Sequence, residues 1–192
     1  MKQNSVNIKW KDFLLIPNIL SCLRILLIPV FILLYLNGLK GAAIIVLIIS
    51  GLSDMIDGII ARHFNMISEL GKLLDPVADK LNQAGIVFCL AIKFSQVRVL
   101  LVLFLIKEFC MIVGGLILLH SGQKPIPAKW WGKLSTAVFY IVMTIILIFG
   151  DYTIKFKLPN IMITILTAIS AICLIFSFVN YIPIFYRIKI KN

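Results

Sequence analysis

Residues 53–80 read SDMIDGIIARHFNMISELGKLLDPVADK and lie between two long apolar runs. The chain has eight acidic residues in total, and four of them are the aspartates of this stretch, Asp54, Asp57, Asp75 and Asp79. An unpaired carboxylate is costly to bury in hydrocarbon, and four close together also repel one another. A large positive charge is therefore expected beside them. Structural salt bridges to the lysines of the same stretch are the alternative.

The spacing of these carboxylates indicates how they converge. Asp54 and Asp57 are three residues apart, and Asp75 and Asp79 are four apart, so each pair lies on one face of a helix. Two neighbouring helices would then direct four carboxylates at one point. Oxygen ligands of high charge suit hard divalent cations such as Mg²⁺, Mn²⁺ or Ca²⁺. Two such ions would match the charge of four carboxylates, so the stretch predicts a metal site.

Eight residues of this stretch resemble, without a gap, the signature of the CDP-alcohol phosphotransferase family. The pattern is Asp54-x-x-Asp57-Gly58-x-x-Ala61-Arg62, then eight residues, then Gly71-x-x-x-Asp75-x-x-x-Asp79. Members of this family are membrane enzymes that move a substituted phosphate from a CDP-linked donor to an alcohol. The resemblance implies the same reaction here, with two divalent cations, Mg²⁺ or Mn²⁺, as cofactors.

The resemblance also implies roles for single residues. The metal ligands would be Asp54, Asp57, Asp75 and Asp79, and Asp79 would also be the general base on the acceptor hydroxyl. The residues binding the CDP donor would be Asp54, Gly58, Ala61, Arg62, Gly71 and Asp75. The small residues leave room for a nucleoside, and they equally allow close helix packing. A snorkelling interfacial side chain is the alternative for Arg62.

Composition indicates an integral membrane protein with a single domain over residues 1–192. The chain is 61% hydrophobic and 14% charged, with a mean hydropathy of +1.05, whereas soluble domains are less apolar and more charged. The net charge of +11 raises the question of nucleic acid binding. The basic residues lie in short loops and at both ends without a dense tract, so membrane topology and anionic lipids explain them better, and no nucleic acid partner is expected.

Six apolar runs predict an all-α bundle of six transmembrane helices. Each run is near the ~20 residues that a spanning helix needs, and the bilayer core has no water to satisfy an open backbone. The predicted spans are 16–36, 41–62, 72–93, 98–119, 132–150 and 160–184. Residues 1–15 would form a cytoplasmic segment with a juxtamembrane amphipathic helix near Trp10, residues 16–184 the bundle, and residues 185–192 a cytoplasmic tail.

The distribution of lysine and arginine predicts the orientation of these spans. Eleven basic residues fall on the side of both termini and five on the opposite side. The excess favours termini in the cytoplasm, because cytoplasmic loops are enriched in Lys and Arg. We therefore expect a multi-pass protein of the cytoplasmic membrane with the four aspartates at its cytoplasmic face.

Two further segments suggest where the alcohol acceptor binds. Pro17-Asn18-x-x-Ser21-x-x-Arg24 resembles the opening of bacterial phosphatidylglycerophosphate synthases and of eukaryote-type cardiolipin synthases, which implies acceptor binding by Asn18, Ser21 and Arg24. Arg24 lies about two turns inside the membrane and needs a partner. A lipid phosphate, an aspartate of the signature, or snorkelling to the interface would each supply one.

The second segment, residues 129–136, resembles the G-K-x-x-T segment of members that use glycerolipid acceptors. It implies acceptor binding by Lys129, Lys133 and Thr136, although topology alone also demands cytoplasmic lysines here. In the preceding span, Lys107 and Glu108 are adjacent and are expected to neutralise each other.

Departures from the phosphatidylglycerophosphate synthase pattern leave the acceptor open. The usual Gly-Leu-Arg triplet is replaced by Val113-Gly114-Gly115, and Ser135 stands in place of the usual second lysine. The expected reaction is attack of an acceptor hydroxyl on CDP-diacylglycerol with release of CMP. Glycerol 3-phosphate is the first acceptor and phosphatidylglycerol the alternative. Membrane lipids and a second copy of the chain, as in other dimeric members, are further expected partners, and a cation-coupled transporter is the remote rival.

Overall fold

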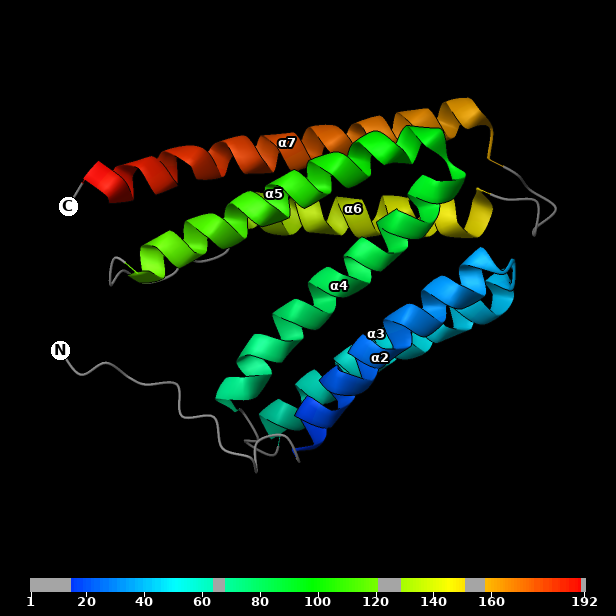
Figure 1. Cartoon of the computed structure of the whole chain (residues 1–192), viewed down its shortest axis with the longest axis horizontal. Coiled ribbons are helices and arrows are strands. Elements are labelled where there is room, and N and C mark those ends of the chain that lie inside the picture. Colours follow the sequence, from blue (N-terminus) through cyan, green and yellow to red (C-terminus); the bar gives the residue numbers. More distant parts are fainter. Residues whose placement is uncertain (1–14, 64–67, 121–128, 151–157, 191–192) are drawn as a thin grey trace. The chain divides into compact units, whose positions relative to one another are not determined.

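A computed structural model describes residues 15–63, 68–120, 129–150 and 158–190, and every element in these ranges is a helix (Figure 1). The elements are α2 (Ile16–Leu36), α3 (Lys40–His63), α4 (Glu69–Lys93), α5 (Ser95–His120), α6 (Trp130–Phe149) and α7 (Asn160–Ile190). The all-α prediction is confirmed. The predicted surface helix near Trp10 lies outside the described residues.

Apolar side chains cover the outside of these helices. Leu26, Phe109 and Ile161 are 66%, 68% and 70% exposed, which is unfavourable in water and fits a hydrocarbon solvent. Within the described ranges, four segments are long and apolar enough to cross a membrane. They are Ile16–Leu36, Ser95–Ile117, Trp130–Phe149 and Asn160–Pro183. The chain is therefore an apolar helical protein of the membrane type.

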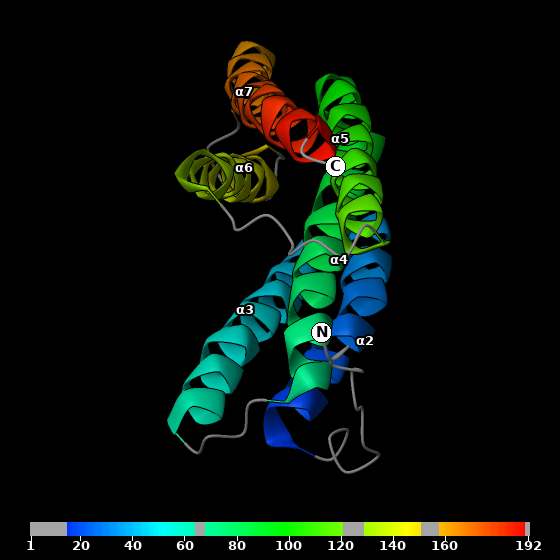
Figure 2. The same cartoon turned by 90° about the vertical axis from the view of Figure 1, so that its left-hand side faces the viewer.

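The chain divides into two compact units, residues 1–89 and 90–192, with the border inside α4. In the first unit α2 and α3 pack side by side as a helical hairpin (Figures 1 and 2). The hairpin turns at Gly38, whose φ of +81° favours glycine. Its amide donates to the Tyr35 carbonyl at 3.1 Å, and the Leu39 amide donates to the Leu34 carbonyl at 2.9 Å. The predicted break between the spans 16–36 and 41–62 is thus a helix C-terminus closed by a left-handed glycine.

One face of α2 is buried along its whole length, and it changes from polar to apolar. The buried residues recur every three or four positions, as expected for one stripe of a helix. They are Pro17, Asn18, Ser21 and Arg24, followed by Ile28, Phe31 and Tyr35. At the apolar end, a Cβ atom at Gly85 of α4 would lie 3.0 Å from Ile28 Cγ2, so glycine allows the close contact there. The polar end of the stripe faces the aspartates.

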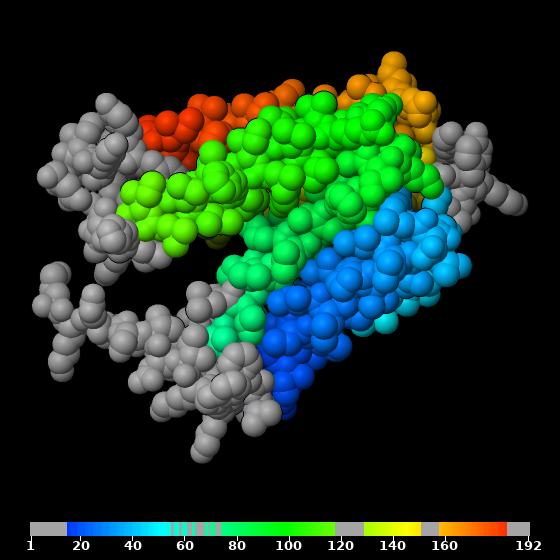
Figure 3. Space-filling model, viewed as in Figure 1, coloured from blue at the N-terminus to red at the C-terminus, as the bar shows by residue number. Residues whose placement is uncertain are grey.

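In the second unit α7 packs against both α5 and α6 (Figure 2), and Figure 3 shows the surface of α7 directly beside that of α5. The rings of Phe104 in α5 and Phe139 in α6 stack with centroids 5.2 Å apart. Tyr181 of α7 fixes the start of α6, because its hydroxyl accepts a 3.1 Å hydrogen bond from the Lys129 amide. A Cβ atom at Gly132 would lie 2.7 Å from the same hydroxyl oxygen, so only glycine fits there without displacement.

All six predicted spans correspond to helices: 16–36 coincides with α2, and the other five differ at their ends by at most six residues. α4 begins at Glu69 instead of residue 72, α5 at Ser95 instead of 98, and α6 at Trp130 instead of 132, while α7 extends to Ile190 instead of 184. The earlier start of α4 has a local cause: Ser68 caps the helix, as described below. The division into two compact units does not test the prediction of a single domain over residues 1–192.

Candidate active site

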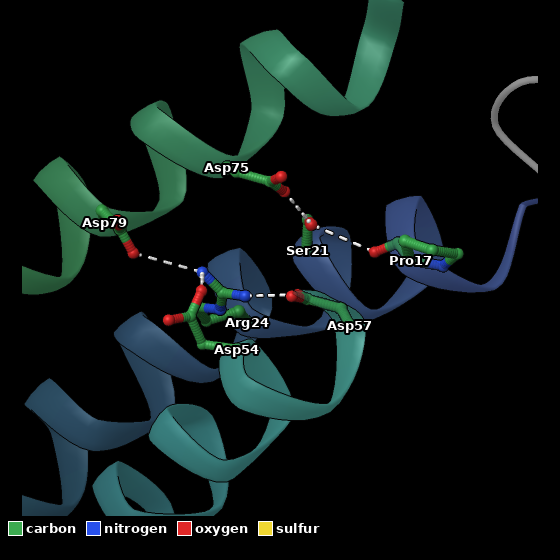
Figure 4. Close-up of polar contacts among 7 residues, drawn as sticks. All are labelled: Pro17, Ser21, Arg24, Asp54, Asp57, Asp75 and Asp79. Carbon is green, nitrogen blue, oxygen red and sulfur yellow. Dashed lines mark hydrogen bonds and ion pairs between the residues drawn. The ribbon is translucent and has the colours of Figure 1, made fainter. Parts of the chain in front are cut away.

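The four aspartates converge on the polar stripe of α2 within the first unit (Figure 4). Arg24 contacts three of them. Its Nη1 lies 2.6 Å from Asp54 Oδ1 and 3.2 Å from Asp79 Oδ1, and its Nη2 bonds to Asp57 Oδ2. Of the partners expected for Arg24, the structure therefore shows aspartates of the signature. Helices α2, α3 and α4 each contribute to this cluster.

The three ion pairs differ in their exposure. The side chains of Arg24 and Asp57 are 1% and 6% exposed, whereas those of Asp54 and Asp79 are 48% and 49% exposed. Breaking a buried pair leaves an uncompensated charge in a medium of low dielectric, while an exposed carboxylate is solvated by water. The Arg24–Asp57 pair is therefore the fixed centre of the cluster, and Asp54 and Asp79 lie at its open side.

Asp75, the fourth carboxylate, is held by a hydroxyl group. Ser21 Oγ lies 2.6 Å from Asp75 Oδ1 and 3.0 Å from the carbonyl oxygen of Pro17 (Figure 4). A hydroxyl has one proton to donate, and an ionised carboxylate is the stronger acceptor. The proton is therefore directed at Asp75. Ser21 is completely buried, so packing restricts its rotamer, and its hydroxyl orients the Asp75 carboxylate.

Ser68 joins the start of α4 to the start of α2. Its Oγ accepts a 2.9 Å hydrogen bond from the Gly71 amide, in the manner of an N-cap, and a 2.8 Å bond from Asn18 Nδ2. A Cβ atom at Gly71 would lie 2.6 Å from Asn18 Oδ1. Gly71 thus has a packing reason to be glycine, and its predicted contact with the donor stays a prediction.

The charges and ligand types of the cluster suit a hard divalent cation. Four carboxylates and one guanidinium leave a formal charge of −3, and all the donor atoms are oxygens. Within the described ranges, however, no three such side chains are spaced as ligands of one ion. Three of the carboxylates are arranged around the Arg24 guanidinium instead. The oxygen ligands therefore suit a divalent ion in their chemistry, while their positions are those of ion pairs with an arginine.

The other predicted site residues lie elsewhere or outside the described side chains. Gly58, Ala61 and Arg62 belong to α3, but their side chains are outside the part that the structure describes. Lys129, Lys133 and Thr136 belong to the second unit, so the geometry of the cluster does not test their predicted role at the acceptor.

Two details of the second unit concern predicted residues. Thr136 Oγ1 donates to the Gly132 carbonyl at 3.0 Å within its own helix. Lys107 Nζ lies 2.8 Å from Glu108 Oε1, which confirms the predicted neutralisation of this largely buried pair.

Two positioning residues were not predicted from the sequence. Ser68 has a local signal, because Ser directly before Glu69 is a favourable N-cap at a helix start. Tyr181 has none, because its contact with Lys129 joins residues 52 positions apart. A tyrosine near the end of an apolar run reads as an interfacial residue unless the packing of α7 on α6 is known.

Comparisons of the sequence with known proteins identify its relatives. The sequence profile of the CDP-alcohol phosphatidyltransferase family matches residues 14–179. A protein of Aquifex aeolicus named CDP-diacylglycerol–glycerol-3-phosphate 3-phosphatidyltransferase is 28% identical over 86% of this chain and 93% of its own length. A Rickettsia typhi protein of the same name is 31% identical over 69% of this chain and 76% of its own length.

A Streptomyces coelicolor protein named cardiolipin synthase (CMP-forming) is 37% identical over 64% of this chain. That match covers 60% of the S. coelicolor protein. A Mycobacterium tuberculosis relative is 36% identical over 70% of this chain, and the match covers 65% of its own length. The chain thus spans less than two thirds of the length of these two relatives. The family profile covers most of the chain and includes all four aspartates. The chain belongs to the CDP-alcohol phosphatidyltransferase family.

Proposed function

We propose that the protein is a phosphatidyltransferase that uses CDP-diacylglycerol as donor. The oxygen of an acceptor hydroxyl attacks the lipid-side phosphorus, the bond from that phosphorus to the diphosphate bridging oxygen breaks, and CMP leaves. The hydroxyl proton passes to a carboxylate of the cluster. The observation that supports this proposal best is the meeting of the four signature aspartates on two neighbouring side chains of α2: Asp54, Asp57 and Asp79 on Arg24, and Asp75 on Ser21.

The aspartates would hold the divalent cations, Mg²⁺ or Mn²⁺, and two ions are expected. Bound there, such ions would neutralise the donor diphosphate and stabilise the leaving CMP. The charge count favours this: two divalent ions and Arg24 against four carboxylates leave a charge of +1, which suits an anionic donor. Asp57 anchors the cluster, since it is the most buried of the three ion-paired carboxylates.

Asp79 is our choice for the general base. Its side chain is 49% exposed at the open side of the cluster, so an acceptor hydroxyl can reach it. Asp54, Asp75 and Gly71 would contact the donor, together with Gly58, Ala61 and Arg62 from α3. This assignment follows the family signature.

The membrane arrangement we propose is six transmembrane helices, α2 to α7, with both termini and the cluster at the cytoplasmic face. The excess of lysine and arginine on that side supports it. A soluble acceptor and the cytidine group reach the cluster from the cytoplasm, while the acyl chains of the donor stay in the bilayer. The protein would work as a homodimer in the cytoplasmic membrane.

For the acceptor we propose glycerol 3-phosphate, with phosphatidylglycerol as the alternative. The A. aeolicus relative, whose name contains glycerol 3-phosphate, matches along 93% of its own length and so resembles this chain in overall extent. The two lysines at the start of α6, Lys129 and Lys133, would meet the acceptor phosphate. The relative named cardiolipin synthase, together with the departures at residues 113–115 and 135, supports the alternative.

The test is release of CMP from CDP-diacylglycerol by the purified protein, with and without divalent cation. Asp75→Asn and Asp79→Asn are expected to abolish turnover while the protein stays folded. Asp151→Asn, at an aspartate outside the signature, is the matched control and should keep activity. Near-normal turnover by either cluster variant would contradict the assignment. A transporter would make no CMP, so the same assay separates the remote rival.

A further inference from the structure

The Arg24 guanidinium occupies the place where a cation is needed among the aspartates. It is 1% exposed, its Nη1 is shared by Asp54 and Asp79, and its Nη2 bonds to Asp57. Its Nε has no hydrogen-bond partner among the described residues, so ion pairs with carboxylates are the contacts that hold the group. A guanidinium is charged at any pH at which the protein is folded.

The two ends of the guanidinium face different surroundings. On the Nη2 side, the Asp57 side chain is only 6% exposed, so its bond to the guanidinium is shielded from water. On the Nη1 side, Asp54 and Asp79 are about half exposed and can be reached by a dissolved cation. A divalent ion approaching the cluster therefore meets the two carboxylates that share Nη1, and it competes with Nη1 for the same oxygens.

We propose that Arg24 is a built-in counter-cation that holds the aspartate cluster together when no divalent ion is bound. On ion binding it releases Asp54 and Asp79 from Nη1 and keeps Asp57 on Nη2. This inference rests on the proposed function, because it assumes that the cluster binds divalent ions. Arg24 is thus a positioning residue: it acts through the carboxylates, and the fixed Asp57 pair keeps it near them in both states.

The charge balance explains why exchange is favourable. The three carboxylates on the guanidinium carry two more negative charges than the guanidinium balances by itself, and the group that Ser21 offers to Asp75 is a neutral hydroxyl. A second cation is therefore attracted even with Arg24 in place. Without Arg24, repulsion among the carboxylates destabilises the ion-free protein, and a divalent ion relieves more repulsion when it binds.

The experiment compares Arg24→Gln, Arg24→Lys and Arg98→Gln with the unchanged protein in detergent micelles. Arg98 is an exposed arginine whose Nε donates to the Ala91 carbonyl, so Arg98→Gln is a matched control for loss of one arginine charge. Two quantities are measured for each protein. The first is the melting temperature in EDTA and in saturating Mn²⁺, and the second is the Mn²⁺ concentration at half-saturation, from the electron paramagnetic resonance signal of free Mn²⁺.

Arg24→Gln is expected to lower the melting temperature by about 10 °C in EDTA, and by less than half as much in Mn²⁺, because the ion replaces the lost charge. Its half-saturating Mn²⁺ concentration should fall roughly tenfold, since a competing positive charge is gone. Arg24→Lys should lie between Arg24→Gln and the unchanged protein, because an ammonium keeps the charge without the forked geometry. Arg98→Gln should match the unchanged protein in both quantities.

If Arg24→Gln lowers the melting temperature equally with and without Mn²⁺, Arg24 only packs the helices, and the proposal is overturned. An unchanged or higher half-saturating concentration would overturn it as well. If Arg24→Gln cannot be obtained folded even in Mn²⁺, the proposal fails, because the ion is expected to take over the charge. If the unchanged protein binds no Mn²⁺, the proposed metal site fails first, so the two failures are distinguishable.

Discussion

Gly71→Ala should destabilise the protein by forcing apart the starts of α2 and α4. The new Cβ would lie 2.6 Å from Asn18 Oδ1 and 3.2 Å from Ser68 Oγ, both of which are buried side chains. Carbon and oxygen atoms without a bond do not approach as closely as 2.6 Å. The Asn18 side chain must therefore retreat, and its 2.8 Å hydrogen bond to Ser68 is weakened or lost.

The expected magnitude follows from three contributions. Overpacking a buried site costs about 1–3 kcal/mol. Loss of the hydrogen bond to Ser68 costs about 1 kcal/mol more. Alanine is intrinsically better than glycine in a helix by up to about 1 kcal/mol, which offsets part of the loss. The net destabilisation is about 2 kcal/mol, which corresponds to a fall of ~4–8 °C in melting temperature for a chain of this size.

The assay is thermal unfolding in detergent micelles and EDTA, so that ligand binding does not contribute. Gly51→Ala is the matched control, because a Cβ at this helical glycine meets nothing within 4 Å, and it should be neutral or slightly stabilising. In an Asn18→Ala background Gly71→Ala should cost less, by a coupling of about 1–2 kcal/mol. A Gly71→Ala protein as stable as the Gly51→Ala protein would refute the packing argument.

Three further predictions concern other parts of the molecule. Asp57→Asn should lower the free energy of unfolding in EDTA by about 3–5 kcal/mol, because it removes the most buried partner of a buried arginine. Asp54→Asn changes a half-exposed side chain and should lower the free energy of unfolding by less than about 1 kcal/mol. Equal melting temperatures for the two variants would contradict the division of the cluster into a buried and an open side. Gly132→Ala should lower the melting temperature, because the new Cβ would lie 2.7 Å from Tyr181 Oη. Adding Tyr181→Phe removes that oxygen and should restore part of the lost melting temperature. A double variant as unstable as Gly132→Ala would contradict the contact. In steady-state kinetics Lys133→Ala should raise the KM of the acceptor more than that of the donor; the opposite pattern would move Lys133 to the nucleotide.

The helices of this protein could be predicted closely from the sequence because hydrophobicity, length and breaks agree. Each apolar run is near the length of a span, and the Asn37-Gly38 break coincides with a glycine in the left-handed region. Helix starts were less accurate. The capping bond of Ser68 to Gly71 adds three residues to the start of α4, and it lies in a polar stretch that hydrophobicity assigns to a loop.

The site could be predicted in part. The spacing of the four aspartates and their need for a positive charge followed from the sequence. That Arg24 supplies this positive charge did not follow from the sequence, because a lipid phosphate, an aspartate and the membrane interface were all compatible with Arg24 at this position. Arg24 reaches Asp57 across 33 positions and Asp79 across 55, and only the packing of α2 against α3 and α4 decides which carboxylates it contacts.

The resemblance of residues 17–24 to an acceptor-binding segment shows a second limit of sequence reasoning. A motif records which residues occur together without recording what they touch. In the structure Ser21 and Arg24 contact the aspartates, and Asn18 contacts the cap of α4. These contacts give all three residues a positioning task, whatever they contribute to the acceptor.

The most direct test of the proposed reaction uses purified protein in detergent micelles with CDP-diacylglycerol and either Mg²⁺ or Mn²⁺. Glycerol 3-phosphate and phosphatidylglycerol are supplied one at a time, and CMP and the lipid product are quantified together. We expect CMP and phosphatidylglycerophosphate in equal amounts with glycerol 3-phosphate, and none without the divalent ion. Turnover with phosphatidylglycerol alone would establish the alternative acceptor. Absence of CMP with both acceptors would contradict the phosphatidyltransferase proposal itself.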